Sequence, residues 1–318
     1  MSNVLVTGGA GFIGSHLVEV LLKKGYKVRV IDNFITGKKE NLAFIQSLDI
    51  PSEQIEIIEG DIREIETCRK VMEDIDYVLH QAALPSVPRS IEDPFTTNEI
   101  NIKGTLNLLW AAKEKGIKRF IYASSSSVYG DQPISPKTET LIPQPLSPYA
   151  GSKLAGEYYC SIFYHVYGLE TVSLRYFNVF GPRQDPNSPY AAVIPKFITA
   201  FLQDKSPEIY GDGEQTRDFT YVLDVVTANI LAMKTPGIGG EVFNIAYGQS
   251  TSINQLAGII KDILQTKIEP IHVAPRPGDI RHSLASIEKA KKQLNYFPKW
   301  ELEEGLKKTI EYYLTLTK

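Results

Sequence analysis

The amino-acid sequence predicts an α/β fold, a doubly wound parallel sheet with a smaller α/β lobe, and three observations support this prediction. In the first half, short runs of β-branched residues alternate with helical stretches, the pattern of βαβ units around a parallel sheet. A cluster of glycines directly follows the first of these runs. Beyond residue 177 several prolines interrupt the pattern: Pro182, Pro186, Pro189, Pro195 and Pro207. This later region favours a small cap with binding loops over a second doubly wound sheet.

Strands and helices alternate regularly along the first half of the chain. Strands are predicted at Val4–Thr7, Tyr26–Asp32, Ile55–Glu59, Asp76–His80, Arg119–Ala123 and Thr171–Tyr176. Helices are predicted at Phe12–Lys24, Ile65–Glu73, Ile100–Lys115 and Ser147–Gly168. The last helix has clear ends, because Ser147 is a good N-cap before a proline and Gly168 suits the position just past the C-terminus.

The chain is expected to form two interleaved lobes, since no linker, internal repeat or low-complexity tract separates them. The first lobe is residues 1–176 with returning segments from roughly 216–246, and the second is mainly residues 177–318. A length of 318 residues fits this arrangement.

The composition is that of an ordinary globular protein. Lysine plus arginine number 34 against 37 acidic residues, a net charge of −3, which argues against nucleic-acid and membrane-surface partners. Cys68 and Cys160 have no metal-ligand spacing, and two cysteines exclude a disulfide scaffold. Met1 is followed at once by a predicted strand, without a targeting segment. We therefore expect a cytoplasmic protein with no metal site.

The glycine cluster predicts a dinucleotide-binding turn. Gly8, Gly11 and Gly14 lie between a predicted strand and a predicted helix, where bare backbone and a helix N-terminus can approach a pyrophosphate. Asp32 ends the next strand 18 residues after Gly14, close to the ~20 residues typical of a carboxylate that binds the ribose of NAD. This carboxylate would repel a 2′-phosphate, so NAD is expected, with NADP left open by nearby cations: Arg29, Lys38 and Lys39.

Tyr149 and Lys153 form a candidate catalytic pair. They are four residues apart near the start of the Ser147–Gly168 helix, so they share one face, and no other of the 17 tyrosines has a lysine at this spacing. A phenol with a pKa near ~10 is a poor base, and a neighbouring ammonium stabilises the phenolate. A plain surface pair is the alternative, and the upstream glycine turn favours catalysis.

A run of hydroxyls, Ser124–Ser127, follows the predicted strand Arg119–Ala123. Ligands of parallel sheets bind beyond the carboxyl ends of strands, and a hydroxyl there can relay a proton between Tyr149 and a substrate. Serine runs are also common in plain loops, so the run alone decides nothing.

Together these features resemble the extended short-chain dehydrogenase/reductase family, and within it the nucleotide-sugar 4-epimerases, over essentially the whole chain. The motifs that carry the resemblance are Thr7–Gly14, Asp32-Asn33, Gly60–Ile62, His80–Ala83, the serines before Val128-Tyr129-Gly130, Ser147–Lys153, Leu174–Asn178, Arg217-Asp218 and Arg276–Asp279. The resemblance implies a Rossmann-type NAD-binding lobe and a nucleotide-sugar-binding cap.

The resemblance also implies roles for individual residues. The implied catalytic residues are Ser125, Tyr149 and Lys153. The implied NAD-binding residues are Gly8, Gly11, Phe12, Ile13, Gly14, Asp32, Asn33, Asp61, Ile62, Gln81, Ala82, Ala83, Asn101, Tyr149, Lys153 and Phe177. The implied substrate-binding residues are Ser86, Val87, Arg89, Ser125, Ser126, Asn178, Val193, Ile209, Tyr210, Arg217, Arg276, Asp279 and Ser283.

Among these, Asn178, Arg217 and Arg276 match positions that hold the substrate diphosphate, although each arginine could equally form a structural ion pair. Phe177 matches a position beside the nicotinamide. Ile209-Tyr210 lies where the family stacks the uracil, with a core tyrosine as the alternative.

The sequence departs from galactose-type epimerases at Pro85, where they carry a lysine. The loop Ala83–Ser90 and the stretch Asn187–Pro195 resemble the subgroup that acts on N-acetylhexosamines. Ser283 stands where epimerases restricted to glucose and galactose carry a tyrosine. Ser126 and Ser127 replace the Asp-Glu of dehydratases, which argues against a 4,6-dehydratase.

The expected function is NAD-dependent, reversible 4-epimerisation of UDP-hexoses through a 4-keto intermediate, favouring UDP-GlcNAc and UDP-GalNAc and allowing UDP-glucose and UDP-galactose. UDP-glucuronate epimerisation, a reductase, dehydratase or decarboxylase of the same family, and a catalytically silent NAD-binding module remain as alternatives. A homodimer is expected. In the family, the helices that correspond to Ile100–Lys115 and Ser147–Gly168 pair with their copies across a two-fold axis. The second of these helices carries more apolar residues here than one core-facing stripe requires: Tyr158, Tyr159, Ile162, Phe163, Val166 and Tyr167.

Overall fold

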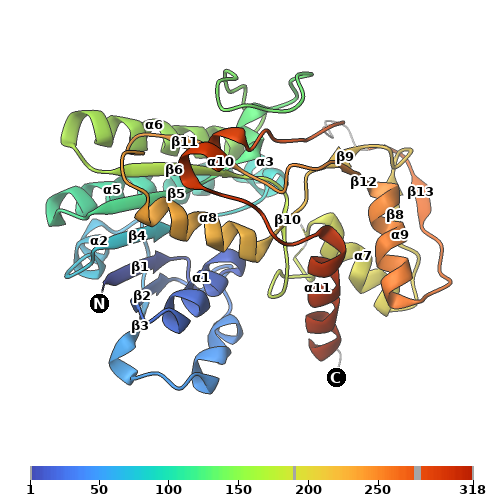
Figure 1. Cartoon of the computed structure of the whole chain (residues 1–318), viewed down its shortest axis with the longest axis horizontal. Helices are drawn as coiled ribbons and strands as arrows, with labels where there is room; N and C mark the ends of the chain where they lie inside the picture. The colour runs from blue at the N-terminus through green and yellow to red at the C-terminus, as the bar shows by residue number, and fades with distance from the viewer. Residues whose placement is uncertain (1, 189–190, 276–280, 317–318) are drawn as a thin grey trace.

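A seven-stranded parallel sheet organises the computed structural model, which describes residues 2–188, 191–275 and 281–316 (Figure 1). The strand order is β11-β6-β5-β4-β1-β2-β3, so the chain winds from β1 to one edge and then to the other. The strands are β1 (Asn3–Thr7), β2 (Lys27–Asp32), β3 (Ile55–Glu59), β4 (Tyr77–His80), β5 (Arg119–Ser125), β6 (Thr171–Tyr176) and β11 (Val242–Ile245). The predicted Rossmann-type fold class is confirmed.

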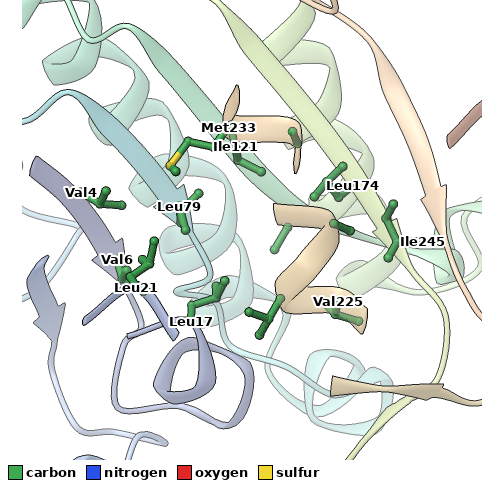
Figure 2. Packing of buried hydrophobic residues seen from close by; sticks show 14 of the residues in the cluster. Val4, Val6, Leu17, Leu21, Leu79, Ile121, Leu174, Val225, Met233 and Ile245 are labelled. Atoms are coloured by element: carbon green, nitrogen blue, oxygen red, sulfur yellow. The ribbon is translucent and has the colours of Figure 1, made fainter. Parts of the chain in front are cut away.

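Helices cover both faces of the sheet because the strands are apolar on both sides. Val4 and Val6 face one core cluster and Leu5 faces the other. Figure 2 shows the first cluster, where α1 and α8 pack on the strands. The helices of this face are α1 (Phe12–Lys23) and α8 (Val222–Lys234), and those of the other face are α2 (Ile65–Val71), α5 (Gly104–Lys115) and α6 (Pro148–Tyr167).

Helix α6 has the predicted ends. Ser147 caps it by accepting a hydrogen bond from the Ala150 amide at 3.1 Å, and Pro148 is its first residue. Gly168 terminates it with φ of 69°, a left-handed conformation that glycine adopts without strain. These caps fix the helix start, which carries Tyr149.

Several predicted boundaries are wrong by one or two residues, and two of the differences lie at the site. The strand predicted to end at Ala123 continues to Ser125, because Ser124 and Ser125 pair with Arg175 and Tyr176 of β6. The first two serines of the run therefore end β5 instead of following it. The helix predicted from Ile100 starts with a π-helical turn, Glu99–Lys103, and becomes α-helical at Gly104.

Short helical elements connect strands in segments where the sequence analysis predicts none. Two precede the π-helical turn, α3 (Val87–Glu92) and α4 (Pro94–Asn98). The others are 3₁₀ helices at Lys39–Ser47, Ser52–Gln54 and Ser126–Tyr129.

The later part of the chain builds a smaller lobe from short elements around its own core cluster. Its helices are α7 (Val193–Leu202), α9 (Ile253–Leu264) and α11 (Leu302–Leu316). Its strands form three pairs, β7 (Val179–Phe180) with β10 (Thr220–Tyr221), β8 (Glu208–Tyr210) with β13 (Ile271–Val273), and β9 (Thr216–Arg217) with β12 (Thr251–Ser252). Between these elements the chain returns to the main sheet as α8 and β11, and α10 (Glu288–Leu294) packs on β11.

Candidate active site

The turn between β1 and α1 has no room for side chains. A Cβ on Gly8, whose φ is +67°, would lie 2.7 Å from the Ala82 backbone nitrogen. A Cβ on Gly14 would lie 2.1 Å from the Gly8 carbonyl oxygen. Gly11 is the N-cap of α1 and offers no side-chain partner, so the first amides of this helix stay available to a ligand. The turn therefore suits a pyrophosphate.

A cavity of about 720 Å³ opens at this turn and extends to Tyr149 and Lys153. Its walls include many of the residues that the sequence analysis assigns to the site: Gly8, Gly11, Phe12, Ile13, Gly14, Asp32, Asn33, Ile62, Gln81, Ala82, Ala83, Ser86, Arg89, Tyr149 and Lys153. Other lining residues are absent from that assignment: Phe34–Lys38, Asn41, Ser124, Tyr176, Arg183–Asp185, Asn187, Ser188, Ala191 and Ala192.

Asp32 has the setting expected of a ribose-binding carboxylate. It accepts hydrogen bonds from the Ala10 amide at 3.0 Å and the Phe34 amide at 2.9 Å. Gly37 lies against it, since a Cβ there would be 2.7 Å from the carboxylate oxygens. Burial raises the pKa of the Asp32 carboxyl, and these amide hydrogen bonds oppose the rise.

The three cations that left NADP open are already paired with acids. Arg29 binds Glu56 at 2.6 Å, Lys39 binds Glu59 at 3.4 Å, and Lys38 binds Asp185 at 2.9 Å. A 2′-phosphate beside Asp32 would have to break these pairs, so the turn and its carboxylate fit NAD.

Three predicted cofactor residues lie behind the cavity wall. Asp61 is held by Arg63 in a two-pronged contact and by Asn33 at 3.0 Å, and Arg63 lowers the pKa of this carboxyl to about 2. Asn101 binds both the amide and the carbonyl of Leu84, which lines the cavity. Phe177 is fully buried against Tyr129. Asp61 and Asn101 thus hold the lining residues Asn33 and Leu84 in place.

Tyr149, Lys153 and Ser125 come together at the carboxyl end of β5. The Ser125 hydroxyl lies near the Tyr149 phenol, and its interaction with the phenol opposes the rise in the pKa of Tyr149 that burial causes. The Lys153 ammonium donates to the Ala123 carbonyl at 2.8 Å and lies 6.0 Å from the Tyr149 ring centre. Burial raises the pKa of Tyr149 and lowers that of Lys153 to about 8. A phenolate at Tyr149 therefore depends on nearby positive charge.

The loop before α3 joins this centre. Ser86, with φ of 98°, caps α3 by accepting from the Arg89 amide at 3.3 Å. Ser90, one residue further, accepts a hydrogen bond from the Tyr149 amide at 3.0 Å. Val87 is exposed, and Ser126 starts the 3₁₀ helix after β5. Helix α3, which follows this loop, is thus hydrogen-bonded to the first turn of α6, which carries the Tyr149 phenol.

The remaining predicted substrate residues that the structure describes lie in the smaller lobe and do not line the cavity. Asn178, with φ of 31°, donates to the Asp218 carbonyl at 3.2 Å. The Ser283 amide donates to the Thr216 carbonyl at 3.1 Å, which places Ser283 beside Arg217 on β9. Val193 starts α7. Arg276 and Asp279 lie outside the described residues.

Ile209 and Tyr210 are neighbours on β8 with opposite surroundings. The Ile209 side chain is buried in the core of the smaller lobe, whereas Tyr210 is half-buried. Only Tyr210 of the two therefore presents a side chain that a base could stack on.

The arrangement suits redox chemistry at a hydroxyl-bearing carbon, since a dinucleotide site adjoins a phenol, an ammonium and a serine. Among the described residues, no group of three or more His, Cys, Asp or Glu side chains is placed to hold a metal ion. No helix in residues 2–188, 191–275 and 281–316 is long and apolar enough to cross a membrane.

Comparisons with known proteins agree with this chemistry. Residues 4–246 match the NAD dependent epimerase/dehydratase family. The chain is 46% identical to a UDP-N-acetylglucosamine 4-epimerase from Methanobrevibacter ruminantium, solved with UDP-N-acetylmuramic acid, with 99% of each chain covered and a TM-score of 0.93.

Two further solved structures are similar over their whole length. UDP-glucose 4-epimerase from Thermotoga maritima, solved with UDP-glucose, is 42% identical, with 99% of this chain and 100% of that chain covered and a TM-score of 0.92. UDP-glucuronic acid 4-epimerase from Bacillus cereus, solved with UDP-glucuronic acid and NAD, is 38% identical, with 99% of each chain covered and a TM-score of 0.91. The chain is an isomerase like these relatives, with NAD as cofactor, and it belongs to the NAD-dependent epimerase/dehydratase family.

Proposed function

We propose that this enzyme interconverts UDP-GlcNAc and UDP-GalNAc at C4, and that it also accepts UDP-glucose and UDP-galactose. The observation that carries the reaction type is the single cavity whose wall contains the glycine turn, Asp32, Tyr149 and Lys153. Ser125, at the end of β5, completes the centre and interacts with the phenol.

In the proposed mechanism Tyr149, as phenolate, accepts the proton of the 4-hydroxyl directly or through Ser125, and C4 loses a hydride as the 4-keto sugar forms. Bound NAD supplies the hydride acceptor and then the donor. Lys153 stabilises the phenolate by its charge. Asn178, Arg217 and Arg276 anchor the diphosphate while the keto sugar turns and presents its other face. Tyr149 then returns the proton to the new 4-hydroxyl, so no net oxidation occurs.

The preference for N-acetylated sugars is supported by two features. Ser86 and Arg89, from the loop that resembles the N-acetylhexosamine subgroup, line the cavity. Ser283 is small, and its amide is bound to the Thr216 carbonyl beside Arg217, a proposed anchor of the diphosphate. The 46% identical structure is named a UDP-N-acetylglucosamine 4-epimerase, which agrees with this preference.

Incubation with a panel of UDP-sugars, without added cofactor, tests the function. NMR is expected to show the C4 epimer accumulating from UDP-GlcNAc, because the cofactor is restored in every cycle. A sample without enzyme controls for spontaneous change. Absence of any C4 epimer across the panel contradicts the proposal, and loss of water or carbon dioxide identifies a dehydratase or decarboxylase instead. Turnover of UDP-glucuronate alone overturns the substrate assignment.

We propose the same division of labour between the lobes as the sequence predicts. Residues 1–176, with the returning segments, hold NAD, and the later residues hold the nucleotide sugar. The return of α8 and β11 to the main sheet supports this interleaving.

We also propose that the enzyme is a homodimer that pairs α5 and α6 of two copies. Phe163 is buried and Tyr159 is half-buried, so these two pack inward, whereas Tyr158, Ile162, Val166 and Tyr167 stay exposed. Ile91 of α3 and Phe95 of α4, helices that contact α6, are exposed too. Helices α5 and α6 lie at the end of the molecule away from α9 and α11 (Figure 1). A second copy would cover the face that these exposed residues form.

Light scattering at micromolar concentration is expected to give the mass of a dimer, and Ile162→Lys is expected to give a monomer, because a lysine in a dry interface loses hydration. Phe297→Lys, at an exposed apolar residue outside this face, is the matched control and should stay dimeric. A monomer mass for the unmodified protein would refute the proposed dimer.

A further inference from the structure

A buried ion pair lies directly behind the proposed catalytic residues. Glu157 is one helical turn after Lys153 on α6, and Arg175 is on β6. The Arg175 Nε donates to Glu157 Oε1 at 2.9 Å and its Nη2 donates to Oε2 at 2.7 Å. The side chain of Glu157 is 3% exposed and that of Arg175 is 4% exposed. Burying two charges costs solvation that an apolar pair would not, so stability alone does not account for them.

The Glu157 carboxylate is also tied to the end of β5. The Ser124 hydroxyl donates to Glu157 Oε1. Ser124 lines the cavity and is the residue before Ser125, so one carboxylate connects the serine strand with the helix of Tyr149 and Lys153.

Arg175 is itself fixed, which gives the carboxylate little freedom to turn. Its guanidinium lies 4.7 Å from the Tyr129 ring centre, and the Tyr129 hydroxyl donates to the Asn244 side chain at 2.7 Å. Glu157 is therefore held by Ser124 on one side and a braced arginine on the other.

Building on the proposed function, we propose that Glu157 is a positioning residue for the proton transfer. Locked by Arg175 and Ser124, its carboxylate holds the end of β5 against the turn of α6 that carries Lys153, so that Ser125 and Lys153 keep their places beside Tyr149.

The charges around Lys153 agree with this role. The titratable groups that act on Lys153 are His80 on β4, Tyr122 on β5, and Tyr149 and Glu157 on α6. Next to these groups, Cys160 acts on Tyr122, Arg175 pairs with Glu157, and Tyr176 of β6 pairs with Ser125. Burial lowers the pKa of His80 to about 3 and raises the pKa values of Tyr122, Cys160 and Tyr176, so these four are neutral at pH 7. Burial raises the pKa of Tyr149 as well, so its phenolate depends on nearby positive charge. Among these groups Glu157 carries the negative charge, and it raises the pKa of Lys153 against the effect of burial.

Replacement of Glu157 by glutamine tests the proposal, because it keeps the shape and removes the charge. The pKa of Lys153 should fall, so the alkaline limb of the kcat profile should move to lower pH. At a pH above the pKa of Lys153 in both proteins, kcat of Glu157→Gln should be about tenfold below that of the unmodified enzyme for each unit by which this pKa falls. The absorbance titration of the Tyr149 phenolate, taken as the difference from Tyr149→Phe in the same background, should move to higher pH. This second readout needs no UDP-sugar.

Two further variants separate positioning from stability. Glu170→Gln breaks the Arg119–Glu170 pair, 2.9 Å long, at the far end of β5 and β6, and should leave both pH profiles unchanged. Glu157→Gln combined with Arg175→Met removes the stranded guanidinium, and should recover folding stability while both profiles stay shifted.

The proposal is wrong if Glu157→Gln and the unmodified enzyme give the same pH profile of kcat and the same phenolate titration. It is also wrong if the double variant returns both curves to those of the unmodified enzyme. Failure of the proposed function gives a different result. If the unmodified enzyme epimerises no UDP-sugar, that function fails, and the phenolate titration still decides on Glu157.

Discussion

Replacing Tyr149 with phenylalanine is expected to lower kcat about 10²- to 10⁴-fold, the usual contribution of a general acid or base. The ring keeps its place on the first turn of α6, so binding of NAD and UDP-sugar should change little. What disappears is the hydroxyl that meets Ser125 and takes the 4-hydroxyl proton. Turnover measured by NMR, together with separate binding titrations for both ligands, distinguishes a lost proton path from a lost site.

Tyr122→Phe is the matched control for this result. Its hydroxyl donates to the Lys153 carbonyl at 3.3 Å, and its ring centre lies 5.2 Å from the Lys153 ammonium, so the two tyrosines share a neighbourhood. Removing this hydroxyl should cost much less kcat, because it lies outside the proton path. If Tyr149→Phe retains more than about a tenth of the activity, a loss smaller than general acid–base catalysis implies, another group moves the proton.

The first half of the fold could be predicted because its signals are local. Ile55–Glu59 and Thr171–Tyr176 appear with the predicted bounds, because each is a short run rich in β-branched and aromatic residues. This signal is the same in β6, which is buried throughout, and in β3, which is a largely exposed edge strand. β11 lies within the returning segments expected at roughly 216–246, but its place in the sheet could not be predicted. It is a four-residue edge strand whose place depends on pairing with β6, from Val242 opposite Ser173 to Ile245 opposite Tyr176. A contact that distant in the sequence leaves no periodicity to read.

The residues of the candidate site also fall into two groups, those that local spacing predicts and those that only contacts distant in the sequence bring to the site. The glycine turn, Asp32 and the Tyr149–Lys153 pair were predictable because each depends on spacing within one or two consecutive elements. Arg183–Asp185 line the cavity for a non-local reason: Arg183 pairs with Glu19 of α1, and Asp185 pairs with Lys38 after β2. No local pattern marks such partners. The family resemblance in turn implies roles for Asp61, Asn101 and Phe177, which the structure places behind the cavity wall.

Ser283→Tyr is expected to abolish turnover of UDP-GlcNAc and UDP-GalNAc while sparing or improving turnover of UDP-glucose and UDP-galactose. Ser283 is half-buried, and its amide is hydrogen-bonded to the Thr216 carbonyl beside Arg217. The backbone that would carry the tyrosine ring is therefore held in place. The ring would occupy the space proposed for the acetamido group. A pocket left partly empty by the smaller sugars costs ~1–3 kcal/mol, part of which the ring should restore.

Two control variants show whether space is the cause. Ser283→Ala keeps the space and removes only the hydroxyl, so it should retain turnover of the N-acetylated pair. His282→Tyr adds the same ring at the exposed neighbouring position and should leave the ratio of kcat/KM values between the two sugar pairs unchanged. If Ser283→Tyr still epimerises UDP-GlcNAc with near-normal kcat/KM, the acetamido group lies elsewhere. If it abolishes turnover of both pairs alike, the ring blocks the diphosphate anchor at Arg217 and Ser283 does not select between sugars.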